Sequence, residues 1–116
     1  MKSIRESIIG RKGSRNIKQS LRNGDVVETR QGIYSIYIQD ENGFLSGFGP
    51  GRTICVFNRL QAWDENLISL NSRDEWDVVK IYHKPTNKIF YRSPSFKELN
   101  EYVEWIRDNV KPIVIR

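Results

Sequence analysis

The chain has 116 residues and a formal net charge of +5, with 38% hydrophobic and 28% charged residues. This size and balance favour a single globular domain, and its short apolar runs predict neither a membrane-spanning helix nor a signal peptide. Cys55 is the only cysteine, which excludes an internal disulfide, and we expect a reducing, cytoplasmic location.

The positive charge is concentrated at the N-terminal end. Residues 1–22 contain seven basic residues and one acidic residue, a net charge of +6, whereas the other 94 residues contain twelve basic and thirteen acidic residues, a net charge of −1. Such asymmetry favours an arm for an anionic partner, although basic side chains also keep a small surface soluble. We predict a basic arm over residues 1–22 and a folded domain over residues 23–116. The candidate anion ligands of the arm are Arg11, Lys12, Arg15 and Lys18.

Short helices are predicted within the arm. Residues 2–9 allow about two helical turns, and residues 14–22 allow a second short helix with Ser14 as its N-cap. Two interpretations stay open. Either the arm orders only when it binds a partner, or its apolar side chains hold it against the domain. These side chains are Ile4, Ile8, Ile17 and Leu21.

The dipeptide Asn23-Gly24 is typical of a turn, and segments rich in β-branched and aromatic residues follow it. We predict five strands, over residues 25–30, 33–39, 52–57, 76–82 and 87–92. Residues 40–51 are polar and rich in glycine, which predicts a long connection. Residues 58–75 have a mixed pattern that favours a helical turn.

A C-terminal amphipathic helix is predicted over residues 95–109. Ser95 and Glu98 have the spacing of a capping box, and apolar residues then recur every three or four positions. Pro112 ends the helix, and residues 113–116 add a strand at the sheet edge. The sequence thus predicts a mainly β (α+β) fold, a small barrel or curled antiparallel sheet with one C-terminal helix and a partly helical basic arm.

Three segments carry a family resemblance: "LRNGDVVETRQGIYSIYI" (21–38), "DENL" (64–67) and "WDVVKIY" (76–82). They resemble small phage-encoded proteins with an SH3-like barrel, in which a Gly-Asp strand opens the barrel and a Trp-Asp strand comes near its end. The resemblance covers about residues 21–84 and implies an SH3-like fold. For a phage-encoded protein it also implies a location in the host-cell cytoplasm. The helix at 95–109 departs from that pattern. Because SH3-like folds bind RNA, peptides or small ligands, the fold does not choose among them.

The sequence does not favour an enzyme. Cys55 lies in an apolar strand pattern and is expected to be a small buried hydrophobe, and the single histidine, His83, is distant in the chain. One Cys and one His do not make a zinc site. Among the clustered carboxylates, Asp77 is expected to face water. We therefore predict no catalytic residues, metal or cofactor.

Ligand-binding candidates lie in a glycine-rich stretch and among the aromatic residues. "GFGPGR" (47–52) lets backbone amides approach a phosphate, with Arg52 as a donor, although it equally suits a flexible connection. Tyr34 and Tyr37 point to opposite faces of one strand, so at least one is expected outside the core. Phe44 and Phe48 are expected to be exposed. Tyr34, Tyr37 and Phe48 are therefore candidates for stacking on a base, the alternative being that they only pack.

Three functions remain open. The leading hypothesis is a non-enzymatic phage-type protein that captures an anionic nucleotide, such as a host-defence signal, in pockets between the subunits of a homo-oligomer. The second is a nucleic-acid-binding module whose arm lies along phosphates. The third is a protein-interaction or virion-associated module whose arm docks an acidic protein.

Overall fold

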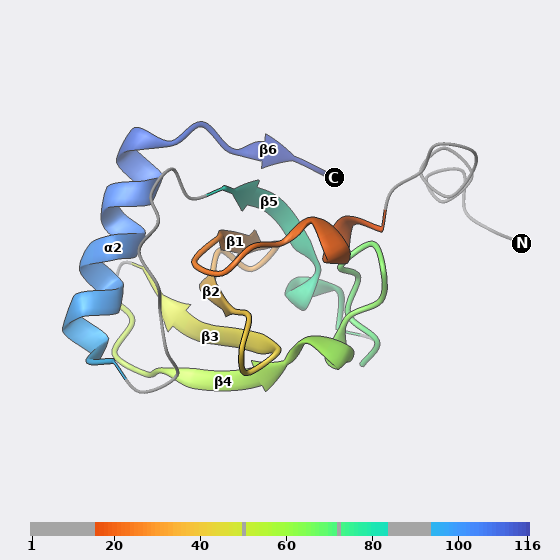
Figure 1. The fold of residues 1–116 in the computed structure, drawn as a ribbon, viewed down its shortest axis with the longest axis horizontal. Coiled ribbons are helices and arrows are strands. Elements are labelled where there is room, and N and C mark those ends of the chain that lie inside the picture. The colour runs from red at the N-terminus through yellow and green to blue at the C-terminus, as the bar shows by residue number, and fades with distance from the viewer. Residues whose placement is uncertain (1–15, 50, 72, 84–93) are drawn as a thin grey trace, which may run out of the picture.

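The computed structural model describes residues 16–49, 51–71, 73–83 and 94–116, and its centre is an antiparallel sheet of six strands (Figure 1). The strand order is β4-β3-β2-β1-β5-β6, so the sheet is open, with β4 and β6 at its edges. The strands are β1 (Val26–Thr29), β2 (Tyr34–Ile38), β3 (Gly43–Phe48), β4 (Val56–Arg59), β5 (Val78–Tyr82) and β6 (Ile113–Val114). This confirms the mainly β fold with its antiparallel sheet.

Side-chain alternation along β2 divides the interior into two cores. Tyr34, Ile36 and Ile38 join one buried cluster, whereas Tyr37 joins the cluster on the opposite face. Every residue of β2 is buried, because β1 and β3 flank the strand and further elements cover both faces of the sheet. The expectation that Tyr34 or Tyr37 lies outside the core was therefore wrong.

The helix α2 (Phe96–Asn109) covers the first of these faces (Figure 1). It starts where predicted, since the Ser95 hydroxyl accepts a hydrogen bond from the Glu98 backbone N–H at 3.1 Å. Its apolar stripe packs against β1, β2, β3 and β5 through Leu99, Val103 and Ile106. The predicted helix and its capping residue are confirmed.

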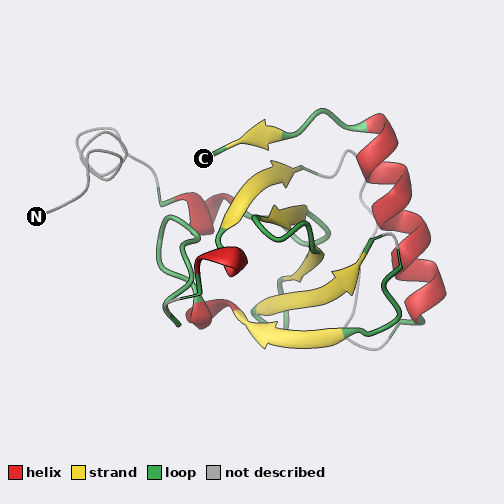
Figure 2. Cartoon of the chain, turned by 180° about the vertical axis from the view of Figure 1, so that it is seen from behind, coloured by secondary structure: helices red, strands yellow, loops and turns green. Residues whose placement is uncertain are grey.

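Three short 3-10 helices lie on the opposite side of the molecule from α2 (Figure 2). They are η1 (Ile17–Ser20), η2 (Leu60–Ala62) and η3 (Asp74–Trp76). With the segments around them they contribute Ile17, Leu21, Leu60 and Trp63 to the second core. The described part of the predicted arm, residues 16–22, thus packs against the body through Ile17 and Leu21, two of the four side chains that the second interpretation named. The other two, Ile4 and Ile8, lie outside the described residues.

Strand β3 corrects the prediction of a long connection over residues 40–51. Its pairing with β2 and β4 places it inside the sheet, and Phe44 and Phe48 are fully buried rather than exposed. The glycine at position 47 marks crowding: a Cβ there would lie 1.8 Å from the carbonyl oxygen of Ile54. The third predicted strand is also shorter, since β4 begins at Val56.

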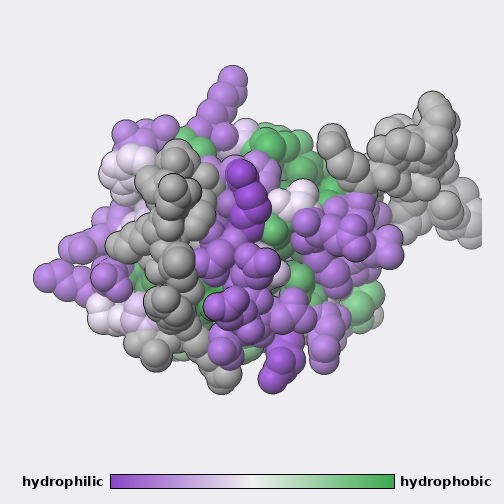
Figure 3. Space-filling view, viewed as in Figure 1, coloured by the Kyte–Doolittle hydropathy of each residue, from purple (hydrophilic) through white to green (hydrophobic). Residues whose placement is uncertain are grey.

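The C-terminal segment forms one edge of the sheet. β6 pairs with β5, as predicted for a last edge strand. Its residues Ile113 and Val114 are exposed, and hydrophobic surface lies at this position in Figure 3. In the described part of the chain, no helix has both the length and the apolar character needed to cross a bilayer. The predicted strand over residues 87–92 lies outside the described residues.

Candidate functional site

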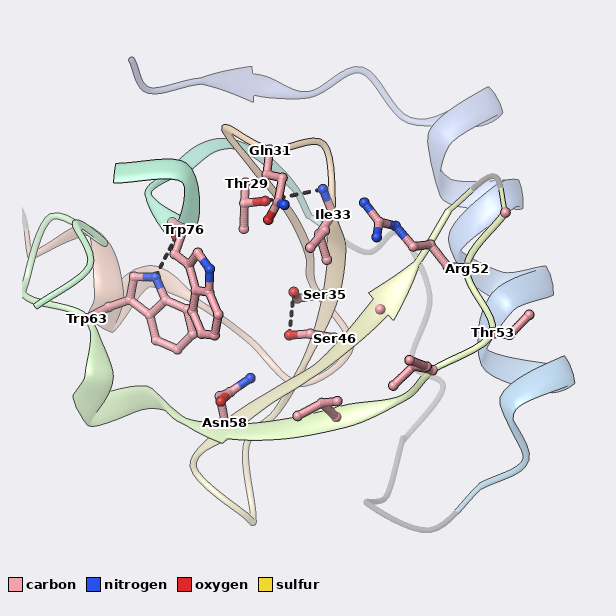
Figure 4. Close-up of a pocket in the computed structure, with 14 residues that line it drawn as sticks. Thr29, Gln31, Ile33, Ser35, Ser46, Arg52, Thr53, Asn58, Trp63 and Trp76 are labelled. Atoms are coloured by element: carbon pink, nitrogen blue, oxygen red, sulfur yellow. Dashed lines mark hydrogen bonds between the residues drawn. The ribbon is translucent and has the colours of Figure 1, made fainter. Parts of the chain in front are cut away.

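A pocket of about 310 Å³ opens on the sheet face opposite α2 (Figure 4). It lies between the β1–β2 turn and the hairpin that joins β3 to β4, and this volume is at the lower end of the range for small-molecule sites. The lining residues are Thr29, Gln31, Ile33, Ser35, Ser46, Gly47, Gly51, Arg52, Thr53, Ile54, Val56, Asn58, Trp63 and Trp76.

Two tryptophans form one end wall of the pocket. The indole Nε1–H of Trp63 donates to the backbone oxygen of Trp76 at 2.9 Å, and the two rings stack with their centroids 6.5 Å apart and their planes 28° apart. The Arg73 guanidinium carbon lies 5.8 Å from the Trp76 ring centroid, which is within cation–π distance. Trp63 is buried and Trp76 is half-buried. The wall is therefore apolar, and its rings pack in or against the second core.

Hydroxyl and amide groups line the middle of the pocket. The hydroxyls of Ser35 and Ser46 form a hydrogen bond of 2.8 Å between β2 and β3, and Figure 4 shows this pair between the tryptophans and Arg52. The Thr29 hydroxyl accepts from the backbone N–H of Ile33 at 3.2 Å. The amide of Asn58 comes from β4. These groups give a bound ring or sugar both hydrogen-bond donors and acceptors.

Arg52 lies at the end of the pocket away from the tryptophans (Figure 4). The hairpin that carries it passes so close to Gly47 that only a glycine fits there, and Gly47 has a φ of +107°. Arg52 is exposed and is the only charged residue among the described residues of the lining. Within the described ranges its guanidinium forms no hydrogen bond or ion pair, so its donors are available to an anion.

The predicted ligand residues fall into four groups. Arg52 lines the pocket. Lys18 instead donates from Nζ to the Trp63 carbonyl oxygen at 2.7 Å, which ties η1 to the loop beneath the tryptophan wall. The buried aromatics are Tyr34, Tyr37 and Phe48, whose rings lie in the two cores rather than in the pocket. The remaining candidates, Arg11, Lys12 and Arg15, lie outside the described residues.

Sequence reasoning did not find the tryptophan wall or the serine pair. Trp63 lies in residues 58–75, which have a mixed pattern, and Trp76 is the first residue of the predicted strand over 76–82, so only the fold brings them together. The serine pair had a usable signal: Ser35 alternates with the apolar residues of a predicted strand, and a polar residue on a buried strand face needs a hydrogen-bond partner. Its partner, Ser46, lay in the segment predicted as a connection.

Two other polar residues differ from expectation. Asp77 was expected to face water but is buried, since its carboxylate accepts from the Ser69 N–H at 2.9 Å and lies 3.6 Å from Arg30 Nη2. Cys55 was expected to be buried but is exposed, because β4 begins only after it. Among the described residues, no three His, Cys, Asp or Glu side chains are grouped as metal ligands.

A second polar cluster lies where β1, β5 and α2 meet. Asp25 is fully buried, and its Oδ2 accepts from the Arg22 backbone N–H at 2.9 Å and lies 2.8 Å from Nδ1 of His83. The Tyr102 hydroxyl donates to the Gly24 carbonyl oxygen at 2.6 Å. Burial raises the pKa of Tyr102 above its usual value, and the nearby Asp25 charge raises it further. This cluster joins α2 to the sheet.

Comparison of the chain with protein-family models, curated proteins and solved structures found no match.

Proposed function

We propose that this protein is a non-enzymatic binding protein that captures a small anionic nucleotide in the pocket between the β1–β2 turn and the β3–β4 hairpin. The observation that supports this most is the distribution of chemistry along the pocket, with an indole wall at one end and, at the other, the Arg52 guanidinium, which has no partner among the described residues. A nucleotide carries the complementary groups at its two ends: a flat unsaturated ring that can pack on an indole, and a phosphate that can pair with a guanidinium.

Each part of such a ligand has a matching group in the pocket. The apolar surface of Trp76 packs against the base, and the fork of donors on Arg52 binds the phosphate. Hydroxyl and amide groups between them hydrogen-bond the sugar or the edge of the base: Thr29, Gln31, Ser35, Ser46 and Asn58. The stacking role expected for Tyr34, Tyr37 and Phe48 passes in this proposal to Trp76, because those three rings are buried elsewhere.

Calorimetric titration with a panel of cyclic and linear nucleotides tests the proposal, and the hairpin offers a matched control. Arg52 and Arg59 are both exposed arginines of this hairpin, but only Arg52 lines the pocket. Arg52→Ala is expected to weaken binding at least about tenfold, the effect of losing one charge-assisted hydrogen bond, whereas Arg59→Ala leaves the affinity unchanged. The absence of heat with every nucleotide would end the proposal.

The finer identity of the fold and its biological role belong to the same proposal. β1, which begins after Gly24-Asp25, pairs directly with β5, which follows Trp76-Asp77. This arrangement supports the SH3-like relationship in which the opening strand and a late strand meet. We propose that the protein is of phage type and removes a host-defence nucleotide signal. Ile54 and Val56, which are exposed and line the pocket, support a homo-oligomer, whose subunits native mass spectrometry would count.

A nucleic-acid-binding module is the second candidate, and the charge of +6 on residues 1–22 favours it. Neutralising several phosphates would make the affinity fall steeply with salt. A mobility-shift assay at two salt concentrations separates the candidates. Two results together would favour this second function over the first. The full chain would bind no mononucleotide, and its mobility shift would disappear on deletion of residues 1–15.

A further inference from the structure

We infer that the ligand is a mononucleotide with one phosphate group that carries a single negative charge, such as a nucleoside 3′,5′-cyclic monophosphate. This inference rests on the proposed function and narrows the ligand class. The charge and the size of the pocket support it.

The charge of the lining limits the charge of the ligand. Of the described residues that line the pocket, Arg52 is the only one with a formal charge, and the others are apolar side chains, glycines, hydroxyls and amides. One guanidinium compensates one phosphate charge through its pair of parallel donors. Each further phosphate charge held in the pocket would meet only neutral groups, and a charge that leaves water without a compensating partner costs free energy. The lining therefore favours a monoanion over a di- or triphosphate.

The size and ends of the pocket limit the number of nucleotides. A volume of about 310 Å³ is at the lower end for small-molecule sites. Trp63 and Trp76 close one end, and the Ser35–Ser46 pair and Arg52 follow in line (Figure 4). One base, one sugar and one phosphate occupy these three positions in order. A second base has neither a second aromatic wall nor a second cation among the lining residues.

The test is a calorimetric series on the full chain at fixed ionic strength. The ligands share one base and differ in charge and size: adenosine, 3′,5′-cyclic AMP, AMP, ADP, ATP and cyclic di-AMP. The series is repeated with guanine and cytosine bases. For the base that binds best, we expect the cyclic monophosphate to bind at least about tenfold more tightly than the nucleoside, the triphosphate and the cyclic dinucleotide. Arg52→Ala should lower its affinity to that of the nucleoside, while Arg59→Ala leaves it unchanged.

Different outcomes would overturn the single-phosphate inference and the proposed nucleotide binding. A triphosphate or a cyclic dinucleotide that binds as tightly as the cyclic monophosphate would overturn the single-phosphate inference and leave nucleotide binding intact. If no member of the three series binds, both fail together. If the cyclic monophosphate binds equally well to Arg52→Ala, the phosphate is held elsewhere and the inference is wrong.

Discussion

Nδ1 of His83, at the end of β5, lies 2.8 Å from Oδ2 of Asp25, whose side chain is entirely buried just before β1. A carboxylate accepts hydrogen bonds but donates none, so Nδ1 carries the proton in this contact. Asp25 also accepts from the Arg22 backbone N–H. The pair therefore joins the first strand to the fifth strand of the chain, at the point where these two strands are neighbours in the sheet.

Replacing His83 with alanine is expected to destabilise the fold by about 1–3 kcal/mol, because a buried acceptor loses a partner. Urea unfolding of His83→Ala, Asp25→Asn and the double variant measures the interaction. We expect the loss from His83→Ala to be clearly smaller when Asp25 is already asparagine. Equal losses in both backgrounds would show that the imidazole does not act through this carboxylate.

Gly47→Ala is expected to destabilise the β3–β4 hairpin more than Gly51→Ala. At position 47 a Cβ would meet the Ile54 carbonyl oxygen and the φ is +107°, so crowding and backbone strain each cost about 1–3 kcal/mol. At Gly51 the φ is +74° with no atom within 4 Å, which leaves only the left-handed backbone cost of about 1–2 kcal/mol. Unfolding midpoints compare the two variants, and an equal loss would contradict the close approach.

Stability is expected to fall as the pH rises above 10.0, the usual tyrosine pKa. Burial raises the pKa of Tyr34, Tyr37, Tyr82 and Tyr102 in the folded state. In that range the unfolded chain has lost tyrosine protons that the folded chain keeps, so alkali favours unfolding. This contribution is fully present below pH 10.0. Urea midpoints from about pH 8 to pH 11, with tyrosinate absorbance of the folded protein, measure it. Ionisation of all tyrosines near pH 10 without unfolding would disagree.

Arg116 is expected to hold the C-terminal segment against the second core. Its guanidinium donates to the Leu67 carbonyl oxygen at 3.3 Å and also to the carbonyl oxygens of Asn66 and Val78. Arg116→Met removes these hydrogen bonds to part-buried carbonyl oxygens and should cost about 1–3 kcal/mol. Lys111→Met is the control, since Lys111 is exposed in the same segment. Equal unfolding midpoints for the two variants would refute this role.

The elements that sequence predicted well are those in which local pattern and tertiary environment agree. The β-branched and aromatic residues of 34–38 and 78–82 suit strands, and Ser95 caps its helix as its spacing indicated. Strand β3 was missed because Gly43 and Gly47 are typical of a loop. In the fold both glycines are needed for close approach, since a Cβ at Gly43 would lie 2.4 Å from the Asn58 carbonyl oxygen.

The site was predicted only in part, because it is assembled from distant segments. Arg52 was found, since a basic residue after three glycines is a local signal for anion binding. Tyr34 and Tyr37 were expected to include at least one residue outside the core, but both are buried, because periodicity does not report that both faces of β2 are covered. Trp63 follows η2 and Trp76 ends η3, and a hydrogen bond joins them. Neither sequence segment has a pattern that predicts contact with the other.

The most direct measurement of the central claim uses the three tryptophans of the chain as probes within one spectrum. Trp63 and Trp76 line the pocket, whereas Trp105 is exposed on α2, which packs on the other face of the sheet. Nuclear magnetic resonance titration with a nucleoside 3′,5′-cyclic monophosphate would follow their indole N–H signals. If the nucleotide binds in this pocket, the Trp63 and Trp76 signals shift to saturation while the Trp105 signal stays in place. Unchanged Trp63 and Trp76 signals, or a shift of Trp105 alone, would contradict binding in this pocket.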